Sequence, residues 1–117
     1  MATTHISAVT TGPTGTSATP DLLLDSGMMY SLLPDDLWRA LDLSPKRTMR
    51  FCLADGTTIE RQGSECHFAL AGADGHSPVI LGEPGDEPLL GTVTLEVMGL
   101  MLNPFTRTLE PMRMLLA

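Results

Sequence analysis

Short apolar runs, each bounded by glycine, proline or an Asp-Gly pair, follow one another along most of the chain. Runs of this length, several of them alternating with polar residues, are typical of β-strands. We predict strands at residues 5–9, 19–25, 49–53, 57–61, 66–70, 78–81, 100–102, 108–109 and 112–116. Many short strands with frequent turns are the pattern of a sandwiched or closed β domain.

Turn residues separate these runs. Turns are predicted at residues 11–16, at Asp55-Gly56, at Asp74-Gly75 and at Asn103-Pro104. Asp-Gly is a strong hairpin signal because glycine takes backbone angles that other residues avoid. The pair at Asp55-Gly56 therefore predicts a polar-tipped hairpin over residues 50–62.

Two segments carry helical signals instead. Pro34 suits the first turn of a helix, and the two aspartates after it suit the positive N-terminal end. Apolar residues at helical spacing follow, among them the single tryptophan, Trp38, which we expect to anchor the core. Pro45 is expected to stop this helix. Residues 92–98 are expected to form one or two helical turns closed by Gly99.

Length and composition indicate one folded domain. The chain has 117 residues, of which 43% are hydrophobic, and a domain of this size can fold without metal or disulfide staples. We expect a single domain, residues 1–117. Within it we expect a Thr/Gly-rich N-terminal strand and turn (1–19), a core (20–111) and a C-terminal strand (112–117).

The charge balance narrows the range of partners. The chain carries 7 basic and 14 acidic residues, a net charge of −7, which argues against nucleic acid or an anionic membrane surface as a partner. No apolar run approaches the roughly 20 residues of a membrane span. Residues 1–5 show no signal-peptide pattern. We therefore expect a cytoplasmic protein in which Cys52 and Cys66 are free thiols.

Other chemistries lack their motifs. The cysteines and histidines show no Cys-x-x-Cys or His-x-x-x-His spacing, so we expect no metal and no other cofactor. The Gly/Thr run at residues 11–16 lacks the Gly-Lys-Ser/Thr ending of a phosphate-binding loop. A Ser-His-Asp hydrolase would need a Gly-x-Ser-x-Gly elbow, which is absent from the sequence.

One apolar run ends in a carboxylate. Three leucines lead directly into Asp25, Ser26 and Gly27. An aspartate at the end of a buried strand is costly unless it is hydrogen-bonded or paired, a cost most often found at functional sites. A turn in which Asp25 caps its own backbone is the alternative. A second apolar run ending in glycine, residues 89–91, also precedes a helical segment, which hints at a weak internal duplication.

Taken in order, these motifs resemble the retropepsin-like aspartic proteases, the single-domain relatives of the retroviral proteases. Asp25-Ser26-Gly27 looks like the Asp-Ser/Thr-Gly active-site loop, and residues 53–57 (Leu-Ala-Asp-Gly-Thr) look like the flap hairpin. Leu89-Leu90-Gly91 looks like the second hydrophobic-hydrophobic-Gly loop. The resemblance covers about residues 20–115 and includes Ser31-Leu32-Leu33-Pro34, Leu95-Glu96, Gly99-Leu100, Asn103-Pro104 and Leu109-Glu110-Pro111. The family usually has Ala at position 28 and Asp at position 103, where this chain has Met28 and Asn103.

The resemblance implies an all-β fold: a small closed β-barrel of the retropepsin type, with one or two short helices, that forms a two-fold homodimer. Asp-Ser/Thr-Gly occurs once in the sequence, so one chain supplies one catalytic carboxylate, Asp25. The second must come from another chain across a two-fold axis. Ser26 is implied to hydrogen-bond across that axis, and Gly27 to let the substrate backbone approach closely.

The remaining site residues follow from the same resemblance. The flap residues Ala54, Asp55, Gly56 and Thr57 are implied to close over a peptide. Met28, Leu89 and Leu90 are implied to line the substrate cleft. The strands at 5–9 and 112–116 are candidates for a sheet between subunits.

Two functions are left open by the sequence. The first is an aspartic endopeptidase that acts as a homodimer on peptide or protein substrates. The second, suggested by Met28, is a dimer of the same fold that binds peptides or assembles without cleaving them.

Overall fold

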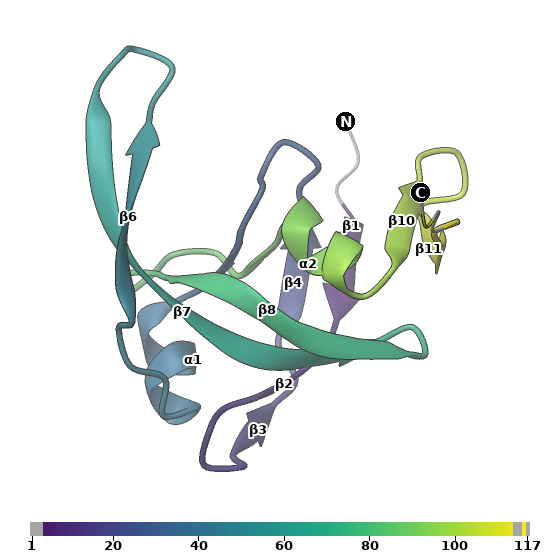
Figure 1. Ribbon diagram of the computed structural model, residues 1–117, viewed down its shortest axis with the longest axis horizontal. Helices are drawn as coiled ribbons and strands as arrows, with labels where there is room; N and C mark the ends of the chain where they lie inside the picture. Colours follow the sequence, from purple (N-terminus) through teal and green to yellow (C-terminus); the bar gives the residue numbers. More distant parts are fainter. Residues whose placement is uncertain (1–3, 114–115, 117) are drawn as a thin grey trace.

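A curled sheet forms the body of the protein. The structure, a computed structural model, describes residues 4–113 and 116. A nine-stranded sheet curls into a half-barrel, which two short helices and a separate two-stranded hairpin complete (Figure 1). The predicted all-β fold class is confirmed. No helix in the described ranges is long and apolar enough to cross a membrane.

The elements follow one another in short steps. The strands are β1 (Thr4–Ser7), β2 (Val9–Thr11), β3 (Ser17–Ala18), β4 (Asp21–Leu24), β5 (Ser31–Leu33), β6 (Arg47–Cys52), β7 (Thr58–Leu70), β8 (Ala73–Leu81), β9 (Leu89–Leu90), β10 (Leu100–Asn103) and β11 (Thr108–Pro111). The helices are α1 (Asp35–Ala40) and α2 (Thr92–Val97). The main sheet runs β1-β4-β9-β5-β8-β7-β2-β3, with β6 paired to β7, while β10 and β11 pair with each other.

The largest departure from the predicted elements lies in β7 and β8. The strands predicted at 57–61 and 66–70 are parts of one strand of 13 residues. The turn predicted at Asp74-Gly75 is wrong, because the chain turns at Ala71 and Gly72, which have φ angles of 50° and 77°. Asp74 and Gly75 pair with β7 instead. A Cβ on Gly75 would lie 3.1 Å from Cγ1 of Val97, so this glycine makes room for α2.

The first helix ends earlier than predicted, whereas the second forms as predicted. The prediction that Pro45 stops the first helix is wrong, because α1 ends at Ala40. Asp42 then adopts a φ of 59°, and its carboxylate accepts a hydrogen bond from the Thr14 hydroxyl at 2.7 Å. The second helix forms as predicted, and Gly99 follows it with a φ of 69°.

Both ends of the chain depart from the predicted strands. The N-terminal strand is interrupted at Ala8, whose N–H donates to the carbonyl of Pro20 at 3.3 Å, and it becomes β1 and β2. Met112 and Arg113 are not in a strand; the N–H of Met112 donates to the carbonyl of Gly99 at 2.6 Å. The remainder of the predicted C-terminal strand lies outside the described residues, apart from position 116.

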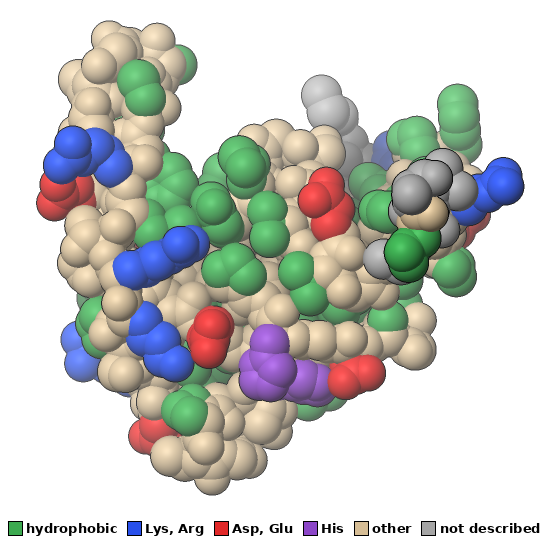
Figure 2. All heavy atoms as spheres, viewed as in Figure 1, with side chains coloured by type: hydrophobic (Ala, Val, Ile, Leu, Met, Phe, Trp, Pro, Cys, Tyr) green, Lys and Arg blue, Asp and Glu red, His purple; other side chains and the backbone are tan. Residues whose placement is uncertain are grey.

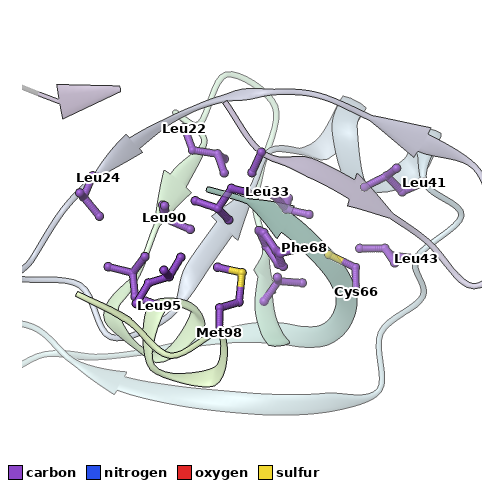
Figure 3. Close-up of a cluster of buried hydrophobic side chains, with 14 of the residues drawn as sticks. Leu22, Leu24, Leu33, Leu41, Leu43, Cys66, Phe68, Leu90, Leu95 and Met98 are labelled. Atoms are coloured by element: carbon purple, nitrogen blue, oxygen red, sulfur yellow. The ribbon is translucent and has the colours of Figure 1, made fainter. Parts of the chain in front are cut away.

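Leucines from many elements make one core. Residues that alternate along β4, β7 and β8 point inward and meet α2 (Figure 3). The largest fully buried hydrophobic side chains are Phe68, Leu22, Leu33, Leu41, Leu90 and Val79. Trp38 packs against the edge of this core, and its indole N–H donates to the carbonyl of Gly82 at 2.9 Å. The predicted core role of Trp38 is therefore confirmed at the edge of the cluster.

The reactivity of the two cysteines can test which residues the core buries. Both are free thiols, as predicted, with Cys52 exposed and Cys66 buried in the core. Burial raises the pKa of Cys66 to about 12 because it disfavours the thiolate. We expect iodoacetamide at pH 8 to modify Cys52 alone in the native protein and both cysteines in denaturant, as measured by mass spectrometry. Equal native modification rates would contradict the structure.

Candidate functional site

The two apolar runs that end in glycine lie side by side. β4 and β9 pair in parallel, with Leu23 opposite Leu89 and Leu24 opposite Leu90. The N–H of Asp25 donates to the carbonyl of Leu90 at 3.3 Å. The two segments are far apart in sequence, and their parallel pairing brings the loops that follow them together at the same end of the two strands.

Asp25 is held at the start of its loop. One carboxylate oxygen, Oδ1, accepts the N–H of Gly27 at 2.9 Å, and the Asp25 carbonyl accepts the N–H of Met28 at 3.1 Å. The capped turn that the sequence left as an alternative is therefore present. The other oxygen, Oδ2, accepts no hydrogen bond from the described residues. The carboxylate is thus oriented but can still bind water or substrate.

The residues after Gly27 are anchored on α2. The carbonyl of Met28 accepts the N–H of Thr92 at 3.0 Å, and the carbonyl of Met29 accepts the N–H of Val93 at 2.8 Å. The first N–H groups of a helix have no partner inside the helix. The Asp25 loop supplies these partners, so the position of the loop depends on α2.

A chain of buried hydroxyls lies under this crossing. The N–H of Gly91 donates to the Ser31 hydroxyl at 3.0 Å, Ser31 Oγ lies 2.6 Å from Thr94 Oγ1, and Thr94 Oγ1 lies 2.8 Å from Ser77 Oγ. The three hydroxyl residues are at most 1% exposed. A Cβ on Gly91 would lie 2.5 Å from the carbonyl carbon of Tyr30. Glycine is therefore required where the two loops cross.

The sequence prediction missed the role of these hydroxyls. In the sequence, Ser31 stands out only as part of a family motif, and no motif marks Thr94 or Ser77. The available signal was a small hydroxyl residue inside an apolar segment, which costs free energy unless it is hydrogen-bonded.

The predicted flap is a long hairpin made by β6 and β7 that projects from the body (Figure 1). At its tip, Oδ1 of Asp55 accepts the hydroxyl of Thr57 at 2.6 Å and its N–H at 2.9 Å. Gly56 has a φ of 88°, a conformation that favours glycine. These hydrogen bonds lower the pKa of Asp55, with the Thr57 hydroxyl as the largest cause.

A cleft of about 720 Å³ lies between the Asp25 loop and the stem of this hairpin. Tyr30 from the loop and Phe51 from β6 meet edge to face, with ring centroids 6.2 Å apart. Figure 2 shows hydrophobic side chains gathered between the hairpin and the body. The apolar lining residues are Leu23, Met28, Met29, Tyr30, Leu32, Phe51, Leu53, Ile59, Ile80 and Leu89. A cleft of this size and composition can hold apolar side chains of a ligand.

Several predicted site residues line this cleft, and others do not. Asp25, Gly27, Met28 and Leu89 are among the lining residues. Ser26 instead borders a smaller apolar pocket of about 240 Å³ beside α2 and β10. The flap-tip residues Ala54, Asp55, Gly56 and Thr57 are exposed and do not line the cleft.

Leu90 requires a correction, because its side chain is fully buried in the core and does not line the cleft. Side chains alternate along a strand, so Leu89 and Leu90 face opposite sides of β9. Tyr30, Phe51 and Arg61 also line the cleft, although no sequence motif predicts this. Alternation along the hairpin could have shown which flap residues face inward.

The described side chains were compared with the arrangements that hold metal ions. Among residues 4–113 and 116, no group of three His, Cys, Asp or Glu side chains is arranged to hold a metal ion. The charged residues that line the cleft are Asp25, Arg61, Asp86 and Glu87.

Comparison with known proteins supports the fold assignment. The structure is similar to the solution structure of the simian foamy virus (mac) protease, with a TM-score of 0.56 and 20% sequence identity. The match covers 80% of this chain and 92% of that chain. No family model matches the chain, and no curated protein matches it. The comparison shows a retropepsin-like fold.

Replacing Thr94 tests the buried hydroxyl chain. We expect Thr94→Val to lower the free energy of unfolding by about 1–3 kcal/mol, because buried hydroxyls of Ser31 and Ser77 lose a partner. Urea denaturation measures the change. Thr92→Val, on the same helix but outside the chain of hydroxyls, should change stability by less than about 0.5 kcal/mol. Equal effects of the two substitutions would rule out the role of the hydroxyl chain.

The flap tip has its own pH dependence. The pKa of Asp55 lies below its ordinary value of 3.8, so the ionised carboxylate holds Thr57 at neutral pH. These hydrogen bonds are lost only as the pH falls through the lowered pKa. We expect the amide signal of Thr57 in NMR spectra to titrate with a midpoint below 3.8, and Asp55→Asn to abolish the titration. A midpoint at or above 3.8 would contradict this hydrogen bonding.

Proposed function

We propose that the protein is an aspartic endopeptidase whose active site forms when two chains place their Asp25 loops about a two-fold axis. The observation that carries the proposal is the position of Asp25. Its carboxylate sits on a loop anchored by a second loop, and it lines a large apolar cleft beneath a hairpin. The similar fold of the simian foamy virus (mac) protease supports the proposal.

The chemistry requires two carboxyl groups. Two carboxyls about 3 Å apart do not both ionise easily, so they share one proton and titrate as a pair. The ionised carboxylate takes a proton from water as the water attacks the peptide carbonyl. The protonated carboxyl donates to the carbonyl oxygen, and the amine leaves after it has gained a proton. Oδ2 of Asp25, which accepts no hydrogen bond within the described residues, is available for these transfers.

A second copy of the chain would supply the second carboxyl. A two-fold interface is self-complementary, so the Asp25 loops would face each other. Ser26 lies at the border of the small apolar pocket beside α2 and β10, where Met101 is 44% exposed. β1 is an edge strand of the main sheet. These features support an interface through Ser26, β1 and the hairpin of β10 and β11.

The substrate would bind as an extended peptide in the apolar cleft. An extended peptide can pair with neighbouring strands through its backbone while alternate side chains enter pockets. Met28 and Leu89 would contact these side chains. The hairpin that carries Ala54 to Thr57 would close over the peptide and exclude water.

A second candidate function keeps the fold and the dimer but lacks cleavage. Met28 lines the cleft close to Asp25 in sequence, and its side chain occupies space that a small residue would leave for substrate. The second candidate is therefore a dimer that binds peptides and does not hydrolyse them.

Replacing the carboxylate tests the first proposal. We expect the wild-type protein to cleave members of a mixed peptide library at acidic to neutral pH. Asp25→Asn should reduce cleavage by about a hundred- to ten thousandfold, because the amide cannot act as a general base. Asp21→Asn is the matched control and should leave cleavage unchanged, because Asp21 is exposed at the start of β4, the strand that leads into Asp25.

The outcomes separate the two candidates. Cleavage that survives Asp25→Asn would refute the protease proposal. A wild-type protein that binds library peptides without cleaving them would favour the binding function. A monomer at micromolar concentration in light scattering would count against both, since each depends on the dimer.

A further inference from the structure

One charged side chain of the flap hairpin, that of Arg61, is among the described residues that line the cleft. Side chains alternate along β6 and β7, so that Phe51 and Ile59 face the cleft while Arg50 and Glu60 are exposed. Arg61 follows Ile59 at the next inward position and lines the cleft. The pattern of the hairpin would favour an apolar residue at this position.

Arg61 lacks a carboxylate partner within the described residues. Arg50, on the opposite face, pairs with Glu60 at 3.0 Å, and Arg39 pairs with Asp35 at 2.8 Å. The guanidinium of Arg61 donates to the backbone carbonyl of Glu60 at 3.1 Å and forms no ion pair with a described residue.

Three carboxylates also line the cleft, those of Asp25, Asp86 and Glu87, and none of them forms an ion pair with Arg61. Asp86 accepts the N–H of Glu83 at 2.7 Å, and Glu87 lies 3.5 Å from Nε2 of His5. Asp25 accepts the N–H of Gly27. Arg61 is therefore the one Lys or Arg among the described lining residues, and its guanidinium forms no ion pair with any described carboxylate.

A ligand that fills the cleft would make the unpaired guanidinium of Arg61 more costly. Arg61 is half-buried among apolar side chains and keeps part of its hydration. A bound peptide under a closed hairpin would displace that water, and an unpaired buried charge is strongly unfavourable. A carboxylate on the peptide would restore the lost hydrogen bonds, because guanidinium and carboxylate pair in a two-pronged geometry.

We infer that Arg61 selects peptides that carry a carboxylate close to the apolar residue held in the cleft. The inference rests on the proposed function, because it assigns a specificity to the same cleft. The carboxylate is either an Asp or Glu side chain or the free C-terminus of the peptide, and both would meet Arg61 in the same way.

The overall charge of the protein makes this preference diagnostic. A net charge of −7 repels acidic peptides in general. Salt screens that general repulsion over about 8 Å at physiological ionic strength. A preference for acidic peptides would therefore have to come from a local contact and not from the field of the whole protein.

The experiment compares matched peptides on matched variants. Peptides with Glu, Gln or Lys at each position around a fixed apolar residue are prepared with free and with amidated C-termini. Cleavage gives kcat/KM for the wild type, and fluorescence anisotropy gives Kd for the Asp25→Asn protein. The same measurements follow in Arg61→Gln, Arg61→Lys and Arg61→Glu. Arg50→Gln is the control on the outer face.

We expect the wild type to prefer Glu over Gln by roughly ten- to a hundredfold at one position, the range for hydrogen bonds to charged groups. Arg61→Gln should abolish the preference, Arg61→Lys should keep part of it, and Arg61→Glu should favour Lys instead. Arg50→Gln should retain the preference. If Arg61 increases kcat/KM and affinity only for peptides with free C-termini, the group that it binds is the terminal carboxylate.

The failures of the two proposals can be distinguished. A wild type without a preference between Glu and Gln, or a preference that survives Arg61→Gln, overturns the role of Arg61 while Asp25-dependent cleavage upholds the protease. Arg61-dependent binding without any cleavage upholds the carboxylate site and refutes the protease. Absence of both binding and cleavage overturns both. The wild-type comparison needs no variant, so it holds even where a substitution impairs folding.

Discussion

The site depends on the crossing of the Asp25 loop and the Gly91 loop at the start of α2. The backbone carbonyls of Met28 and Met29 accept hydrogen bonds from the first two N–H groups of the helix, which have no partner inside it. Gly91 permits a contact that any side chain would prevent. Beneath this contact the buried hydroxyls of Ser31 and Thr94 form a hydrogen bond with each other. A buried polar chain of this kind is stabilising only when every member has a partner, so the crossing tolerates little variation.

The curled sheet uses that crossing to build a cleft. The parallel pairing of β4 with β9 holds the two loops together. β5 pairs in parallel with β8, and β8 in turn pairs with β7 as the second strand of a hairpin. The long strand β7 belongs to the body at one end and to the flap at the other. One strand therefore links the core around Phe68 to the inward face of the hairpin at Ile59 and Arg61. At the stem of the flap, Phe51 also contacts Tyr30 of the Asp25 loop.

Sequence patterns predicted the elements where local and tertiary preferences agree. The three leucines before Asp25 form a buried strand that ends in a capped turn, and Gly56 forms the tip of the flap. The pattern failed at Asp74-Gly75, where a strong turn signal lies inside a strand. Pairing along the whole of β7 and the nearby helix α2 outweigh the local preference of that dipeptide. Tertiary contacts often override local preferences in strands.

The sequence by itself determined the strand-rich fold, the carboxylate loop at Asp25 and its glycine-ended counterpart at residues 89–91. These features depend on local chemistry: apolar alternation, turn residues and a costly aspartate. Only the tertiary structure decided that Leu90 lies in the core, that Ser31 and Thr94 meet, and that Arg61 faces the cleft. Each of these depends on which strand becomes the neighbour and on which face turns inward. That choice arises from pairings between segments far apart in the chain, which local patterns do not contain.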